Sequence, residues 1–187
     1  MGLARERRVT DTLTVSLAGL QAGMAAVLCM LAWLGIAAAW RQSSFWTAEN
    51  LWASTFYGAS AIRSGFSTST LSGLALYLLV YSTLGGIFAA AVRGALPRPR
   101  LVLAAIVGAA AWYYLSFHVI WHTVNPLVSL LHPEQPTLLG HVLYGAVLGR
   151  FPRYLPLATA AAIPVEATVP PELAEPQPTP APNTPET

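Results

Sequence analysis

Charged residues are scarce in this chain of 187 residues, and lysine is absent. Only 10% of the residues carry a charge, whereas a soluble globular domain carries about 25%. Apolar residues make up 55% of the sequence. This composition excludes an ordinary soluble domain and indicates a protein that has lipid as its solvent. All ten basic residues are arginine, which is typical of the base composition of a GC-rich bacterial genome.

Other residues and motifs are missing as well. A single cysteine, Cys29, excludes a disulfide within the chain and a zinc site built from cysteines. No acidic or basic residue lies inside the long apolar stretches, which argues against ion-coupled transport, voltage sensing and aspartyl proteolysis within the membrane. Phosphate loops, dinucleotide fingerprints and a nucleophile elbow are also absent. We therefore expect no enzymatic activity.

What the sequence does contain is long charge-free stretches. An ionised side chain at the centre of a bilayer costs at least about 2.5 to 3.5 kcal/mol, so such stretches mark membrane spans. They predict an all-α integral membrane protein with a domain at 13–151 that holds four transmembrane helices. The spans are expected at 13–40, 71–92, 101–124 and 137–151. The last is short for a crossing and requires local thinning of the bilayer or longer neighbouring helices.

The arginines indicate the orientation of these helices. Eight lie before the first span, between the second and third, or after the fourth, and two, Arg41 and Arg63, lie on the other side. This excess predicts cytoplasmic N- and C-termini, with a basic N-terminal segment at 1–12, in a bacterial inner membrane. The basic N-terminal region is followed by an apolar run that contains the small residues Ala37-Ala38-Ala39, which resemble a cleavage site, so a cleaved signal peptide is an alternative.

Two further segments have recognisable compositions. Residues 47–66 place six apolar residues at helical spacing, which predicts an interfacial amphipathic helix on the outer leaflet or, alternatively, a lid packed on the bundle; the six are Leu51, Trp52, Phe56, Ala59, Ile62 and Phe66. The segment 152–187 is rich in proline, with eight prolines and four glutamates from Pro164 onward. Such a composition predicts a disordered cytoplasmic tail.

Small residues at four-residue spacing indicate where the helices touch, because association in lipid relies on close packing. The patterns are Gly19-x-x-x-Gly23, Gly86-x-x-x-Ala90 and Gly145-x-x-x-Gly149. On the third span, a helical wheel places six residues on one stripe that we expect to face protein, namely Ala104, Gly108, Ala111, Leu115, His118 and His122. These faces predict a compact bundle, an oligomer or contacts with other membrane subunits.

The histidines are the candidate ligands. His118 and His122 are four positions apart, so they share a helix face. They could bind one transition metal or a haem, with His132 or His141 as a further ligand. The pattern is not that of a zinc protease, since Val119 occupies the position of the general base. Packing residues and a proton relay are the alternatives. His141 and Tyr144 are expected to hydrogen-bond to the third span.

These observations favour a non-catalytic structural or accessory component of a membrane assembly. Its expected partners are the lipid bilayer and other membrane subunits or a second copy, met through the Gly/Ala faces. The arginine clusters are short and adjacent to the membrane, which favours anionic lipid over nucleic acid. No cofactor is expected under this interpretation. The alternatives are a metal- or haem-binding membrane protein that uses His118 and His122, or a channel or transporter for small neutral solutes.

Overall fold

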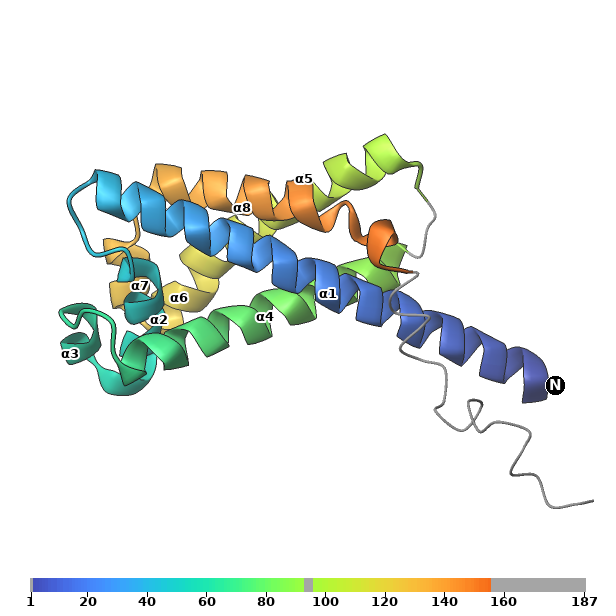
Figure 1. Cartoon of the computed structure of the whole chain (residues 1–187), viewed down its shortest axis with the longest axis horizontal. Coiled ribbons are helices and arrows are strands. Elements are labelled where there is room, and N and C mark those ends of the chain that lie inside the picture. The colour runs from blue at the N-terminus through green and yellow to red at the C-terminus, as the bar shows by residue number, and fades with distance from the viewer. Residues whose placement is uncertain (1, 93–95, 156–187) are drawn as a thin grey trace, which may run out of the picture.

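The computed structural model describes residues 2–92 and 96–155, with side chains from residue 11 onward (Figure 1). These residues form helices joined by short turns, and no strand occurs among them. The predicted all-α fold is therefore confirmed. From residue 156 onward, the predicted proline-rich tail at 152–187 lies outside the described residues.

Three helices in the described ranges are long and apolar enough to cross a membrane. The first is the part Asp11–Trp40 of α1 (Gly2–Trp40), and the second is α4 (Thr68–Val92). The third is a continuous run of α5 (Arg98–Leu115), the π-helix η1 (Ser116–Ile120) and α6 (Trp121–Val124). They match the predicted spans 13–40, 71–92 and 101–124. α1 starts earlier than predicted because residues 3–18 contain no proline or glycine to interrupt it.

The fourth predicted span, 137–151, corresponds to α8 (Glu134–Leu148), which has 15 residues. At a rise of about 1.5 Å per residue it is roughly 22 Å long, shorter than the hydrocarbon core of about 30 Å. The short helix α7 (Pro126–Leu131) precedes it, and the 3-10 helix η2 (Phe151–Tyr154) follows it. Phe151 is fully buried, so the last described residues belong to the packed body.

α1 lies at the centre of the bundle (Figure 1). It packs against α4 on one side and against α8 on the other, and α5 packs against α8. α4 and α5 make no comparable contact within the described residues. The helices therefore form a row in the order α4, α1, α8, α5, in which the two outer helices leave a face open between them.

Glycines allow α1 and α4 to touch along their backbones. A Cβ added at Gly85 would lie 2.5 Å from the carbonyl oxygen of Gly19 and 2.8 Å from the Cα of Gly23. Any larger side chain would have to push the two helices apart. The predicted Gly19-x-x-x-Gly23 face is thus the surface on which α4 packs, and close backbone approach of this kind provides the dispersion contacts that hold helices together in lipid.

On α4 the contact is displaced by one residue from the predicted pattern. Gly85 and Ala89 face α1, and Ala89 is fully buried. A Cβ added at Gly86 would meet Leu20 at an ordinary distance of 3.4 Å. The predicted pair, Gly86 and Ala90, is therefore not the closest contact. Small residues at adjacent positions satisfy the spacing equally well, and the sequence does not distinguish the two registers.

The predicted Gly145-x-x-x-Gly149 face forms the contact between α8 and α5. A Cβ added at Gly145 would lie 2.6 Å from the Cα of Ile106, and one added at Gly149 would lie 2.6 Å from the Cα of Val102. Both glycines therefore permit backbone contact, and they bring the end of α8 onto the beginning of α5.

Residues 47–66 do not form one helix. α2 (Thr47–Tyr57) ends at Gly58, and α3 (Ala59–Ile62) starts in a new direction. Gly58 has a φ of 67° and a ψ of −164°, a conformation that is accessible essentially to glycine alone. α2 packs against α4 with Leu51 and Trp52 buried, while Phe56 is exposed. Packing of α2 on the bundle favours the predicted lid over a helix lying flat on the leaflet.

Replacement of Gly85 by leucine tests the α1–α4 contact. Gly85→Leu should destabilise the protein by about 1–3 kcal/mol or prevent folding, because the added side chain collides with the α1 backbone. Gly108→Leu is the matched control, since a Cβ at Gly108 meets no atom within 4 Å. Thermal unfolding in mild detergent measures the difference. Equal melting temperatures for the two variants would contradict the proposed contact.

Candidate functional site

A cluster of buried histidine and tyrosine side chains lies where α4, α8 and the turn between α7 and α8 meet. Tyr77 and Tyr81 are one helical turn apart on α4 and share a face. His132 follows α7, and His141 and Tyr144 come from α8. All five side chains are buried. Histidine and tyrosine carry polar atoms that need partners away from water, so the hydrogen bonds decide what this cluster can do.

His132 is bonded through both ring nitrogens. The hydroxyl of Thr137 donates to the carbonyl oxygen of Pro133 at 2.6 Å, so it accepts the hydrogen bond that joins it to Nδ1 of His132 at 2.6 Å. The proton of His132 therefore resides on Nδ1. Nε2 then accepts from the hydroxyl of Tyr77 at 3.2 Å. These partners fix a neutral imidazole in one tautomer.

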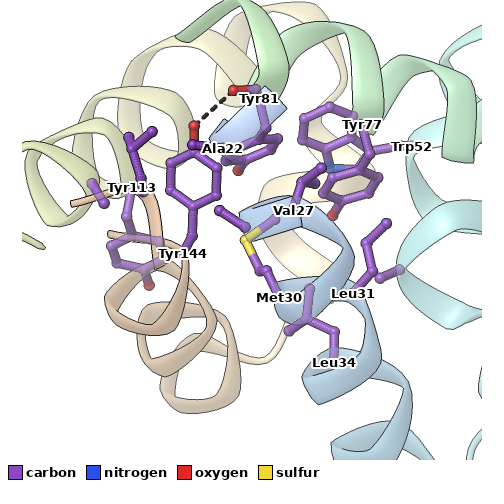
Figure 2. Packing of buried hydrophobic residues seen from close by; sticks show 14 of the residues in the cluster. Ala22, Val27, Met30, Leu31, Leu34, Trp52, Tyr77, Tyr81, Tyr113 and Tyr144 are labelled. Atoms are coloured by element: carbon purple, nitrogen blue, oxygen red, sulfur yellow. Dashed lines mark hydrogen bonds between the residues drawn. The ribbon is translucent and has the colours of Figure 1, made fainter. Parts of the chain in front are cut away.

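His141, on α8, has the same pattern of hydrogen bonds as His132. Its Nδ1 donates to the carbonyl oxygen of Thr137 at 2.8 Å, and its Nε2 accepts from the hydroxyl of Tyr81 at 2.8 Å. The hydroxyl of Tyr144 donates to the carbonyl oxygen of Tyr81 at 2.7 Å (Figure 2). His141 and Tyr144 therefore hydrogen-bond to α4. The expected hydrogen bond from His141 and Tyr144 to the third span is wrong, because that span places the ring of Tyr113 against His141 instead.

Burial determines the charge of His132, which lies in the turn outside the spanning helices. Removal from water disfavours the imidazolium form and, with the nearby His141, lowers the pKa of His132 from 6.5 to about 3. The side chain is therefore neutral at physiological pH. This agrees with the hydrogen-bond pattern, in which Nε2 accepts a hydrogen bond from the hydroxyl of Tyr77 and carries no proton of its own.

α2 closes the cluster with a tryptophan. The ring of Trp52 stacks on Tyr77 with centroids 3.7 Å apart (Figure 2), and it also contacts Trp121 at a centroid distance of 4.7 Å. Asn50 anchors the same helix, since its amide donates to the carbonyl oxygen of Ser64 at 2.7 Å and its oxygen accepts from Thr70 at 2.6 Å. α2 is thus fixed to the start of α4.

Glu49 on α2 is a buried carboxyl group. It is 2% exposed, and its Oε2 atom has no hydrogen-bond partner among the described residues. Burial raises the pKa of Glu49 above its ordinary value, which is partly offset by a hydrogen bond to backbone. The helical pattern of 47–66 assigns Glu49 to the polar side, and a lone acidic residue in an apolar segment is the only signal in the sequence that could have identified it.

His118 and His122 face outward. Both are exposed, and His118 stacks on the exposed ring of Tyr114 at a centroid distance of 5.8 Å. The predicted stripe that includes Gly108 and Ala111 does not face the other described helices of this chain, so a contact of this stripe within the bundle is ruled out. The buried face of the run is instead the side on which Gly145 and Gly149 of α8 pack. It comprises Leu101, Ala105, Ala109, Tyr113, Phe117 and Trp121.

The predicted metal ligands do not converge. His118 and His122 line a pocket of about 240 Å³ at the end of the bundle, together with Glu134 and one side of His132. His141 lies inside the bundle, with both nitrogens already bonded. Within the described residues, no group of three or more His, Cys, Asp or Glu side chains is arranged to hold a metal ion. The geometry gives the metal hypothesis no support, and it stays a prediction.

The Tyr81 hydroxyl should contribute measurably to stability. Tyr81→Phe leaves Nε2 of His141 buried without a donor, which costs about 1–3 kcal/mol. Tyr114→Phe is the control, because the ring of Tyr114 is exposed. Unfolding of both variants in detergent provides the comparison, and an unchanged stability of Tyr81→Phe would show that the bond to His141 contributes nothing.

Acid should destabilise the fold through His132. Between pH about 6.5 and about 3 the unfolded chain binds a proton that the folded chain excludes, so stability falls as the pH is lowered through this window, by at most about 1.4 kcal/mol per unit. The raised pKa of Glu49 acts in the opposite direction.

Melting temperatures measured across this pH range test the assignment. His132→Gln should be less stable near neutral pH and should show a shallower loss on acidification than the wild type. His122→Gln, which removes an exposed histidine, should keep the wild-type slope. If His132→Gln also kept that slope, another group would be responsible.

Comparison with known proteins returns no relative. No family model, no curated protein sequence and no solved structure matches the chain. Its function is therefore inferred from its own residues.

Proposed function

We propose that this chain crosses a bacterial inner membrane four times, with both termini in the cytoplasm, and serves as a non-catalytic structural or accessory subunit of a membrane assembly. The observation that carries the proposal is the open face between α4 and α5. It forms a groove of about 280 Å³, which we call the α4–α5 groove. Its wall includes Leu84, Ile87, Phe88, Gly108, Ala111 and Leu115.

Gly108 is the feature that favours a helix of another subunit as the occupant. It lies in the interior of α5, where glycine costs roughly 0.5–1 kcal/mol relative to alanine. Gly19, Gly85, Gly145 and the other close-packed glycines are each needed for an internal contact, but a Cβ at Gly108 would meet nothing within 4 Å. Packing among the described residues therefore does not explain it. Close approach of a further transmembrane helix would explain the glycine at position 108, since small residues mark such contacts.

The distribution of arginine supports the proposed topology, because eight of the ten lie on the side of both termini. The position of α8 supports a fourth crossing. The turn before it meets Tyr77 of α4 through His132, and Phe151 after it contacts Phe88 near the other end of α4 at a centroid distance of 6.4 Å. α8 with its flanking turns thus runs alongside a spanning helix, so a locally thinned bilayer would complete the crossing.

A non-catalytic role accounts for the buried cluster. His132 and His141 use both ring nitrogens in hydrogen bonds within the protein, so neither has a lone pair or a proton directed at a substrate. A saturated network of this kind positions α2, α4 and α8 relative to one another. A metal or haem role for His118 and His122 stays a prediction, which metal analysis and an absorption spectrum would test. A channel for small neutral solutes also stays a prediction, and flux into liposomes would test it.

Leucine substitutions in the α4–α5 groove test the proposal. Gly108→Leu and Ala111→Leu should leave the melting temperature unchanged but weaken association at least about tenfold, the equivalent of about 1.4 kcal/mol. Ala32→Leu, at an exposed position of α1, is the matched control. The size of the complex extracted from native membranes in mild detergent is the measurement.

Wild type and Ala32→Leu should migrate as a species larger than the single chain, and Gly108→Leu should migrate as the single chain. Wild-type protein that is monomeric under every mild extraction condition would overturn the proposal. So would a complex that keeps its size in the Gly108→Leu variant, because the groove would then not be the contact.

A further inference from the structure

Three arginines meet at the end of the bundle opposite the histidine cluster. Arg98 opens α5, and Arg150 and Arg153 follow α8. Together with Pro99 and Val102 they line a pocket of about 310 Å³. We call it the arginine pocket. It lies on the proposed cytoplasmic side of the membrane.

The glycine contact between α8 and α5 creates this pocket. Gly149 sits against Val102 so closely that an added Cβ would lie 2.6 Å from the Cα of Val102. The turn that carries Arg150 and Arg153 therefore lies directly beside the first turn of α5. Residues about 50 positions apart in the sequence are brought together in this way, so the charge cluster is a product of packing and not of a local run.

The arrangement is electrostatically incomplete. Arg150 and Arg153 follow the C-terminus of α8, where positive charge is favourable, but Arg98 lies at the N-terminus of α5, where the helix dipole already contributes positive potential. Of the three carboxyl groups among the residues described with side chains, Glu49 and Glu134 belong to the other end of the bundle, and Asp11 lies on the exposed N-terminal part of α1. Within the described residues, the guanidinium groups of Arg98, Arg150 and Arg153 make no hydrogen bond or ion pair. An anion in the pocket would balance this charge.

We propose that the arginine pocket binds the phosphate of an anionic phospholipid headgroup. Guanidinium groups match phosphate oxygens through paired N–H donors, and the helix N-terminus adds a favourable field. The pocket lies at the membrane end of two proposed spanning helices, so a phospholipid can place its phosphate there while its acyl chains stay in the bilayer. Basic pockets between helices on the cytoplasmic side are a recognised form of lipid headgroup site.

The acyl chains favour lipid over a soluble phosphate compound. The surface of α5 and α8 next to the pocket continues into apolar helix, with Leu103 and Val107 among its exposed residues. A ligand with two hydrocarbon chains gains from this surface, and inorganic phosphate does not. The site therefore distinguishes a lipid from a free anion by the part of the ligand outside the pocket.

Binding of short-chain phosphatidylglycerol to the full chain in neutral detergent, measured by native mass spectrometry, tests the proposal. Arg98→Gln, Arg150→Gln and Arg153→Gln should each weaken binding about fivefold, the equivalent of about 1 kcal/mol per arginine. Arg100→Gln is the matched control. It removes the same charge from the same turn of α5, but Arg100 does not line the pocket. Phosphatidylcholine of equal chain length should bind more weakly than phosphatidylglycerol to the wild type and to Arg100→Gln, and this preference should shrink in the three pocket variants.

Each outcome decides the proposal. Selective loss in the three pocket variants, with Arg100→Gln near wild type and all melting temperatures unchanged, would support it. Equal weakening by Arg100→Gln would show a diffuse attraction and overturn the pocket. Displacement of the lipid by millimolar inorganic phosphate would overturn the lipid assignment in favour of a soluble phosphate site. Equal binding of phosphatidylcholine would remove the role of headgroup charge.

Discussion

Backbone contact at glycine is the constraint on which the rest of this structure depends. Lipid tails are as apolar as leucine, so helices in a bilayer gain nothing by hiding apolar side chains and must instead approach closely enough for dispersion contacts. Gly19, Gly23 and Gly85 provide this for α1 and α4, and Gly145 and Gly149 provide it for α8 and α5. The histidine cluster and the arginine pocket both exist because these contacts fix the spacing of the helices.

The two ends of the bundle satisfy their polar groups differently. At one end, His132 and His141 have partners within the chain at both ring nitrogens, as a polar group buried away from water requires. That end is closed by Trp52 on Tyr77. At the other end, three arginines share one pocket with no partner of opposite charge among the described residues. The two histidines thus have all their hydrogen-bond partners within the chain, whereas the arginine pocket is the site at which we propose that an anion binds.

Much of the fold was predictable, because a charged side chain inside a bilayer is costly whatever the fold, so charge-free stretches mark the candidate spans. The limits of three helices that are long and apolar enough to span a membrane, and the Gly145-x-x-x-Gly149 contact, follow from local composition. The site was less predictable. The wheel of the third span placed the wrong side against the bundle. On the second span, the closest small-residue contact is at Gly85 and not at the predicted Gly86, since neighbouring small residues fit the same spacing.

The sequence by itself determined that the chain is helical and which stretches are apolar enough to span a membrane, because hydropathy and helix propensity act over neighbouring residues. Only the tertiary structure decided which polar side chains meet. Tyr77 and His132 are 55 residues apart, and Tyr81 and His141 are 60 apart. Such pairs depend on the rotation of each helix about its axis, and that rotation is set by the partner helix and not by the helix itself.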